Sequence, residues 1–130
     1  MRVLILDDDE ARHARFAKWF AGYDVHHVYT ISEFEKKITG GKFDAVFLDH
    51  DLNDYGKNSV VYNGYTTVEL TGFEAAKTLT FLPQELRPTQ VFVHSWNPDG
   101  AKMMVDLLES TGFNVIRWVF DPKAFLKING

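Results

Sequence analysis

The sequence contains no cysteine, and only four of its 130 residues are proline. Without cysteine, neither a disulfide nor a zinc–thiolate centre can hold the fold together. No apolar run approaches the roughly 20 residues that cross a membrane, and the first residues lack the layout of a signal peptide. We therefore expect a cytoplasmic protein that does not contact a membrane.

Positive charge is also in short supply. Fourteen Lys and Arg residues face eighteen Asp and Glu residues, which leaves a net charge of −4. A broad surface for duplex nucleic acid usually needs clustered basic residues, so we do not expect one. A small phosphorylated ligand held by a metal ion is compatible with this charge. The length predicts one domain over residues 1–130, and the composition leaves the oligomeric state open.

Apolar segments with the composition of buried strands alternate with amphipathic segments. Capping residues precede three of the amphipathic segments: Asp8 or Asp9, the box Thr30–Glu33, and the box Thr71–Glu74. This alternation predicts an α/β fold with a doubly wound, five-stranded parallel sheet. The predicted strands are Arg2–Leu6, Asp24–Tyr29, Phe43–Leu48, Gln90–His94 and Phe113–Phe120, with a short final helix over Pro122–Ile128.

One segment, residues 53–70, interrupts the alternation. It places Asn63-Gly64 between two β-prone runs, which is the usual signal of a tight hairpin. We therefore predict a β-hairpin insertion after the third strand.

Polar residues cluster where three predicted strands end, in "LDDDE", "LDHDL" and "VHSWN". Doubly wound sheets bind ligands at the carboxyl ends of their strands, so these side chains are candidates for one site. Crowded carboxylates need a cation or a shared proton. Carboxylate ligands suit Mg²⁺, Mn²⁺ or Ca²⁺, and imidazoles would also admit Fe²⁺ or Zn²⁺. The remaining histidines, His13, His26 and His27, we interpret as surface residues or as residues at the edge of an apolar helical stripe.

These features resemble the receiver domains of two-component response regulators, over nearly the whole chain. The resemblance implies a flavodoxin-like strand order of 2-1-3-4-5. It matches Asp8, with Asp7 or Asp9, to the metal-binding acids. It also matches Asp49 to the phosphoacceptor and Ser95 to the hydroxyl position.

The sequence departs from ordinary receivers in three places. Receivers place a lysine before the proline that follows strand five, whereas this chain has Asp121 before Pro122. His50 and Asp51 stand where receivers have apolar residues, and residues 53–70 replace a short loop. An ordinary phosphorelay would therefore lack its usual cation and gain negative charge.

The departures resemble a narrower family, the cyclic-phosphate-processing receiver-like domains, whose hallmarks are an "LDHDL"-like and an "HSxN"-like strand end. This chain has "LDHDL" at Leu48–Leu52 and "HSWNPDGA" at His94–Ala101. The resemblance implies a metal-dependent phosphoesterase that hydrolyses or processes cyclic phosphates of nucleotides or RNA ends. It leaves the particular cyclic phosphate open.

Each candidate residue has a hypothetical role in that chemistry. The metal ligands, for Mg²⁺ or Mn²⁺, would be Asp7, Asp8 and Asp49. The catalytic residues would be His50, His94, Asp49 and Asp51, with the two imidazoles exchanging protons near neutral pH. The substrate- and phosphate-binding residues would be Ser95, Asn97, Trp96 and Tyr65.

Two other functions fit the same residues. A divergent receiver or pseudo-receiver would bind a partner protein through the face of its fourth helix and fifth strand. A non-hydrolysing binder would capture a cyclic nucleotide without cleaving it. Asp121, in the place of the receiver lysine, favours the enzyme.

Overall fold

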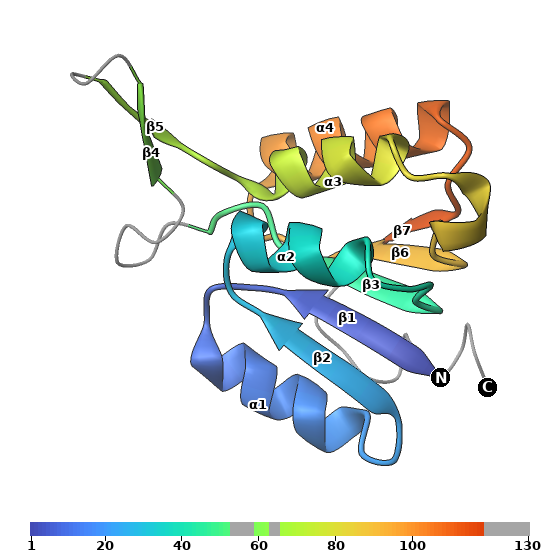
Figure 1. Cartoon of the computed structure of the whole chain (residues 1–130). Helices are drawn as coiled ribbons and strands as arrows, with labels where there is room; N and C mark the ends of the chain where they lie inside the picture. Colours follow the sequence, from blue (N-terminus) through green and yellow to red (C-terminus); the bar gives the residue numbers. More distant parts are fainter. Residues whose placement is uncertain (53–58, 63–65, 119–130) are drawn as a thin grey trace.

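Five parallel strands form the central sheet, seen in a computed structural model that describes residues 1–52, 59–62 and 66–118 (Figure 1). Its strands are β1 (Arg2–Leu6), β2 (Asp24–Val28), β3 (Ala45–Leu48), β6 (Gln90–Val93) and β7 (Val115–Arg117). Their order in space, β2-β1-β3-β6-β7, is the predicted 2-1-3-4-5 order. The predicted doubly wound α/β fold is therefore confirmed.

The helices begin at capping residues. They are α1 (Glu10–Trp19), α2 (Ile31–Ile38), α3 (Gly72–Thr80) and α4 (Pro98–Ser110), with a short 3-10 helix at Gln84–Leu86. Their caps are Asp9, Thr30, Thr71 and Asn97, each of which accepts a backbone N–H of the first turn. Within the described ranges, no helix is long and apolar enough to cross a membrane.

Strand boundaries agree with the sequence for β1, and the other strands are shorter than predicted. β2 ends before Tyr29 because the Tyr29 N–H donates to the Glu33 carboxylate at 3.1 Å, as part of the cap of α2. β7 covers only Val115–Arg117 of the predicted strand. The last two residues of that predicted strand and the predicted helix Pro122–Ile128 lie outside the described residues.

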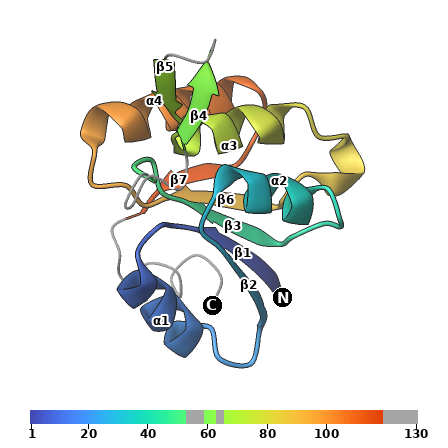
Figure 2. The same cartoon turned by 60° about the vertical axis from the view of Figure 1, so that its left-hand side comes forward.

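Two helical layers cover the sheet. Figures 1 and 2 show α1 on one face and α2, α3 and α4 on the other. Successive strand residues point to opposite faces, so Leu4 and Leu6 pack under α2 to α4, and Val3 and Ile5 pack under α1. Because both faces are covered, the strand interiors are apolar without alternation, as the sequence predicted.

Aromatic rings fill the α1 face. Phe47 on β3 and Phe92 on β6 stack with centroids 4.6 Å apart and planes 10° from parallel. Phe16 of α1 and the buried Trp118 pack on Phe47 at 5.0 and 5.1 Å. These rings bury large apolar areas, which makes this layer a main source of the stability of the sheet.

The inserted segment contains a second, two-stranded sheet. β4 (Ser59–Tyr62) and β5 (Thr66–Glu69) pair antiparallel and stand apart from the central sheet in Figure 1. Their pairing agrees with the predicted hairpin after the third strand. Its turn, residues 63–65, lies outside the described residues.

Backbone hydrogen bonds continue one residue beyond three of the parallel strands. The bonds run from Asp7 N to Val28 O at 3.2 Å, from Asp49 N to Leu6 O at 3.1 Å, and from His94 N to Leu48 O at 3.0 Å. The polar residues after β1, β3 and β6 are therefore held in line at the carboxyl edge of the sheet.

Gly72, the first residue of α3, fixes the path of the chain as it leaves β3. Its N–H donates to His50 O at 2.8 Å. A Cβ at this position would lie 1.8 Å from the Asp49 carbonyl oxygen. Only glycine allows the start of α3 to approach the Asp49–His50 backbone this closely.

The variant Gly72→Ala should therefore destabilise the protein by roughly 1–3 kcal/mol, the usual cost of overpacking. Urea denaturation measures the free energy of unfolding. The matched control is Gly40→Ala, whose Cβ would meet nothing closer than 3.5 Å. Equal stabilities for the two variants would contradict the close-approach explanation.

Candidate active site

A cavity of about 230 Å³ opens at the carboxyl edge of the sheet. It lies where the loops after β1, β3 and β6 meet the first turn of α1, which is where the sequence predicted a site. The side chains that line it are Asp8, Asp9, Arg12, Asp49, Asp51 and Trp96. We call it the acidic pocket.

Asp7 is buried beside the acidic pocket. Its two carboxylate oxygens accept from Arg12 Nε and from Arg12 NH2, both at 2.7 Å. The same carboxylate contacts His94 Nε2 at 2.9 Å and accepts the Asp9 N–H at 2.9 Å. Burial opposes ionisation, but the hydrogen bonds to His94 and Arg12 outweigh it and hold the pKa of Asp7 well below its usual range.

Arg12 is the cation at the centre of this cluster. Beyond its two bonds to Asp7, NH2 lies 3.2 Å from Asp49 Oδ2 and 3.7 Å from Asp8 Oδ1, and NH1 lies 3.5 Å from Asp9 Oδ2. Sequence reasoning missed Arg12. The available signal was its position, because a cation in the first turn of a helix opposes the helix dipole unless acids compensate it.

Asp49 is a buried carboxyl group whose surroundings oppose its ionisation in spite of the Arg12 contact. Burial and the neighbouring Asp7 charge raise its pKa to about 8, although Arg12 acts in the opposite direction. Carboxylate oxygens of Asp7, Asp8 and Asp49 lie within 4.8 Å of one another. This all-oxygen set carries more negative charge than Arg12 neutralises, so the residues fit a divalent cation of the Mg²⁺ or Mn²⁺ type.

His94 and Ser95 lie beneath the acidic pocket rather than on its wall. The His94 side chain is fully buried, and burial lowers its pKa, which favours a neutral ring that donates from Nε2 to Asp7. Ser95 is buried too, and its Oγ accepts the Asn97 N–H at 3.0 Å. These contacts give both residues a positioning role. His94 orients the Asp7 carboxylate, and Ser95 stabilises the turn before α4.

His50 and Asp51 form a pair at the rim. His50 Nδ1 lies 2.8 Å from Asp51 Oδ1, and the same oxygen accepts from Asn97 Nδ2 at 3.4 Å. The His50 ring packs against α4, where a Cβ on Gly100 would lie 2.5 Å from it. Asp49 and Asp51 line the acidic pocket and the intervening His50 does not, which is the period-two pattern of a strand although β3 itself ends at Leu48. His50 supports Asp51 from the side.

The predicted substrate-binding residues differ in placement. Trp96 lines the acidic pocket with 80% of its surface exposed. Asn97 caps α4, because its Oδ1 accepts the Gly100 N–H at 3.0 Å. Tyr65 and Asp121 lie outside the described residues.

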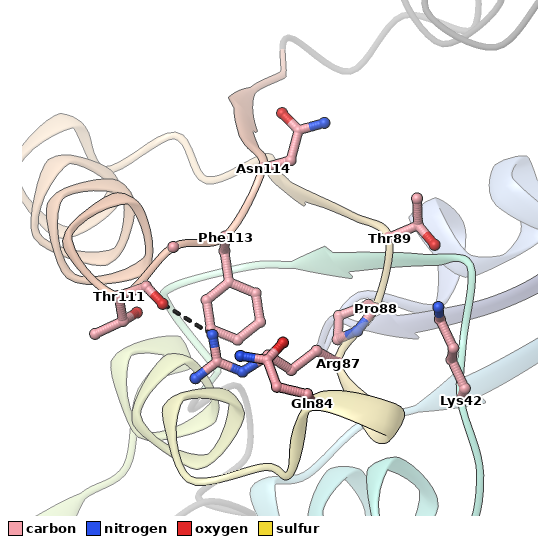
Figure 3. A pocket seen from close by; sticks show the side chains of 9 residues that line it. Lys42, Gln84, Arg87, Pro88, Thr89, Thr111, Phe113 and Asn114 are labelled. Atoms are coloured by element: carbon pink, nitrogen blue, oxygen red, sulfur yellow. Dashed lines mark hydrogen bonds between the residues drawn. The ribbon is translucent and has the colours of Figure 1, made fainter.

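A second cavity, of about 400 Å³, lies at the opposite, amino-terminal edge of the sheet (Figure 3). Arg87 crosses it, donates to Thr111 O at 2.8 Å and to Thr80 O at 3.4 Å, and stacks on the Phe113 ring at 4.5 Å. The guanidinium thus caps the carboxyl ends of α3 and α4. This role is structural, and it leaves the acidic pocket as the candidate active site.

The metal-free protein should lose stability between about pH 4 and pH 8 through Asp49. Its folded pKa of about 8 lies above the ordinary 3.8, so across this window the folded state keeps a proton that the unfolded chain releases. The contribution is fully present below the ordinary pKa and is lost as the pH rises through 8. Asp49→Asn should therefore raise the free energy of unfolding by roughly 2–4 kcal/mol more at pH 8 than at pH 5.

Urea denaturation in EDTA at pH 5, 6.5 and 8 measures this effect. Asp106→Asn on α4, an exposed carboxylate, is the control and should leave the pH dependence unchanged. If the stability of Asp49→Asn depends on pH in the same way as that of the parent protein, burial does not raise the pKa of Asp49.

Solved structures with the same fold are receiver domains. The chain is similar to a CheY-like response regulator receiver domain from Methylobacillus flagellatus, with a TM-score of 0.68, 20% identity, and coverage of 99% of this chain and 95% of that one. It is also similar to the receiver domain of a sensor histidine kinase from Pseudomonas aeruginosa, with a magnesium ion coordinated in the active site cleft. There the TM-score is 0.66, the identity 13%, and the coverage 98% of this chain and 92% of that one. At these identities the likeness establishes the receiver fold.

No curated protein matches the chain. The model of one protein family does match it, over residues 2–110, which include every described residue of the acidic pocket. On this match, and with the receiver fold and strand-end residues described above, the chain belongs to the family of cyclic-phosphate processing receiver domains.

Proposed function

We propose that this protein is a metal-dependent phosphoesterase that hydrolyses or otherwise processes cyclic phosphates of nucleotides or RNA ends. The observation that carries the proposal is the convergence of three carboxylates and one guanidinium beside the cavity. Attack on a phosphate ester needs positive charge for the phosphoryl oxygens and a group that accepts a proton from water. The acidic pocket supplies candidates for both.

Asp7, Asp8 and Asp49 would hold the divalent cation, with Mg²⁺ or Mn²⁺ as the ions their oxygens suit best. Such an ion polarises a phosphoryl oxygen and lowers the pKa of water. Arg12, His94 and the Asp9 N–H together occupy both oxygens of the Asp7 carboxylate, so a cation bound there would replace one of these contacts.

Arg12 would bind the phosphate. Its short bidentate pair with Asp7 fixes the guanidinium plane, and its longer contacts with Asp8 and Asp9 are weak enough for a phosphate oxygen to replace. In the sequence of an ordinary receiver a lysine precedes the proline after strand five, and this sequence has Asp121 at that position. Arg12 therefore supplies a phosphate-binding cation from α1 instead.

Asp51 and His50 would handle the proton. His50 Nδ1–H and the Asn97 amide hold Asp51 Oδ1, so the other carboxylate oxygen is the one that takes a proton from the attacking water. His50 keeps this carboxylate turned toward the acidic pocket. The exposed Trp96 indole would stack on a nucleobase, so the preferred partner is a small nucleotide or RNA terminus rather than a duplex.

Incubation with cyclic and linear nucleotide phosphates, followed by chromatography of the products, tests this function. We expect turnover of a cyclic phosphate with Mg²⁺ or Mn²⁺ and none in EDTA. Asp51→Asn should lower kcat by roughly 100-fold, in the range that a general base contributes. Asp106→Asn, which changes a side chain 61% exposed against 65% for Asp51, should leave kcat unchanged.

The main alternative is a divergent receiver that signals by phosphorylation. The position of Asp49 at the end of β3, beside a cation, favours it. If a phosphoryl mimic such as beryllofluoride binds at Asp49 and no cyclic phosphate is turned over, the protein is a signalling receiver and not a phosphoesterase. Tight cyclic-nucleotide binding without turnover would instead identify a binder.

Arg12→Lys tests the phosphate-binding role. Lysine keeps the charge but loses the bidentate geometry, so kcat/KM should fall by roughly 10- to 100-fold. Arg15→Lys, at an exposed position on the same helix, is the control and should have no effect. If the Arg12→Lys variant keeps the kcat/KM of the parent protein, Arg12 does not recognise the phosphate.

A further inference from the structure

A second cluster of ligand-type side chains lies between α1 and the edge strand β2, outside the acidic pocket. Nδ1 of His13 and Nδ1 of His27 are 2.7 Å apart. Both rings line a cavity of about 370 Å³, together with Glu10, Ala14, Ala17 and Tyr29. The sequence suggested that these histidines are surface or stripe-edge residues, and His13 is 3% exposed on the buried face of α1 that it shares with Phe16.

Hydrogen bonding decides which nitrogen of His13 carries the proton. His13 Nε2 lies 2.8 Å from the Asp7 carbonyl oxygen, and a carbonyl oxygen only accepts, so Nε2 must donate. In the neutral ring the lone pair is then on Nδ1, which points at His27. The two Nδ1 atoms can share only one proton between them.

This arrangement is the usual one for metal-binding histidines. A ligating imidazole commonly donates its other N–H to a backbone carbonyl, which fixes its tautomer and ring orientation. His13 makes this bond to Asp7. Two imidazoles on one tetrahedral ion, with metal–nitrogen distances near 2.0–2.1 Å, would have their nitrogens about 3.3 Å apart. Binding therefore requires the two nitrogens to separate by roughly 0.6 Å from the present 2.7 Å and the rings to turn until both lone pairs face the ion; His27 is half-buried on the edge strand β2.

Glu10 lines the same cavity, and as placed it does not complete a three-ligand group with the two histidines, so it would become a third ligand only after a change of rotamer. It is exposed and lies three residues before His13 on α1, so both side chains rise from one helix face. Glu-x-x-His is a ligand spacing used on helices in metalloproteins. The Tyr29 ring, with its centroid 4.2 Å from that of His13, closes one side of the cavity and fixes the imidazole plane.

We propose that His13, His27 and Glu10 form a second metal site, which takes a divalent transition ion such as Zn²⁺ or Ni²⁺. Its imidazole ligands distinguish it from the all-oxygen acidic pocket, which suits Mg²⁺ or Mn²⁺. The site goes beyond the proposed phosphoesterase function and does not depend on it. An ion bound here would also hold the His13 ring, and through it the carbonyl of Asp7 beside the acidic pocket.

Calorimetric titration of the full chain with Zn²⁺, after EDTA treatment and dialysis and in excess Mg²⁺, tests the proposal. We expect one Zn²⁺ site, and His27→Gln should weaken it by at least about 10- to 100-fold, since even loss of an outer-shell partner costs that much. Glu10→Gln should weaken it less. His26→Gln is the matched control, because His26 is the adjacent strand residue and pairs with Asp24 instead.

Ring ¹⁵N spectra of the parent protein provide a readout that needs no variant. Zn²⁺ should shift the Nδ1 signals of His13 and His27 and leave the His50 and His94 signals in place. Absence of Zn²⁺ binding, parent-like affinity in His27→Gln, or shifts confined to other histidines would each overturn the proposal. Retained binding in Asp8→Asn supports a site separate from the acidic pocket, and its loss there would place the ion in that pocket instead.

Discussion

The interaction on which the site depends is the contact of one guanidinium, that of Arg12, with four carboxylates. Two neighbouring strands of the parallel sheet, β1 and β3, are followed by acids at one edge, and without a cation their repulsion would push the strand ends apart. Arg12 holds Asp7 with two bonds of 2.7 Å and reaches Asp49 at 3.2 Å, which ties α1 to the ends of β1 and β3. His94 reaches the same Asp7 from β6, so the buried carboxylate joins three elements.

Close backbone packing determines where the remaining side chains point. Gly72 lets α3 contact the Asp49–His50 backbone, and Gly100 lets the His50 ring contact the first turn of α4. With both contacts in place, His50 is held against α4 and its hydrogen bond holds Asp51 at the rim. A chain with larger residues at these two glycines would leave β3 along another path, and the Asp51 carboxylate would no longer share the acidic pocket.

The polar residues at this edge are arranged at two depths. Asp7, His94 and Ser95 are buried and bond to other protein groups. Asp51 and Trp96 line the cavity and are exposed, so a ligand can touch them directly. The receiver fold provides the sheet edge, and in this chain that edge carries Arg12 among the acids.

The sequence by itself determined the sheet, its strand order through the receiver resemblance, the helix caps, and the edge at which the site lies. These follow from local composition and from the rule that parallel strands end together. Only the tertiary structure decided which polar residues face the cavity. It buried His94, turned Asp51 inward, made Arg12 the central cation, and brought His13 to His27. Those outcomes depend on contacts between residues up to 87 positions apart, and periodicity along one segment carries no information about them.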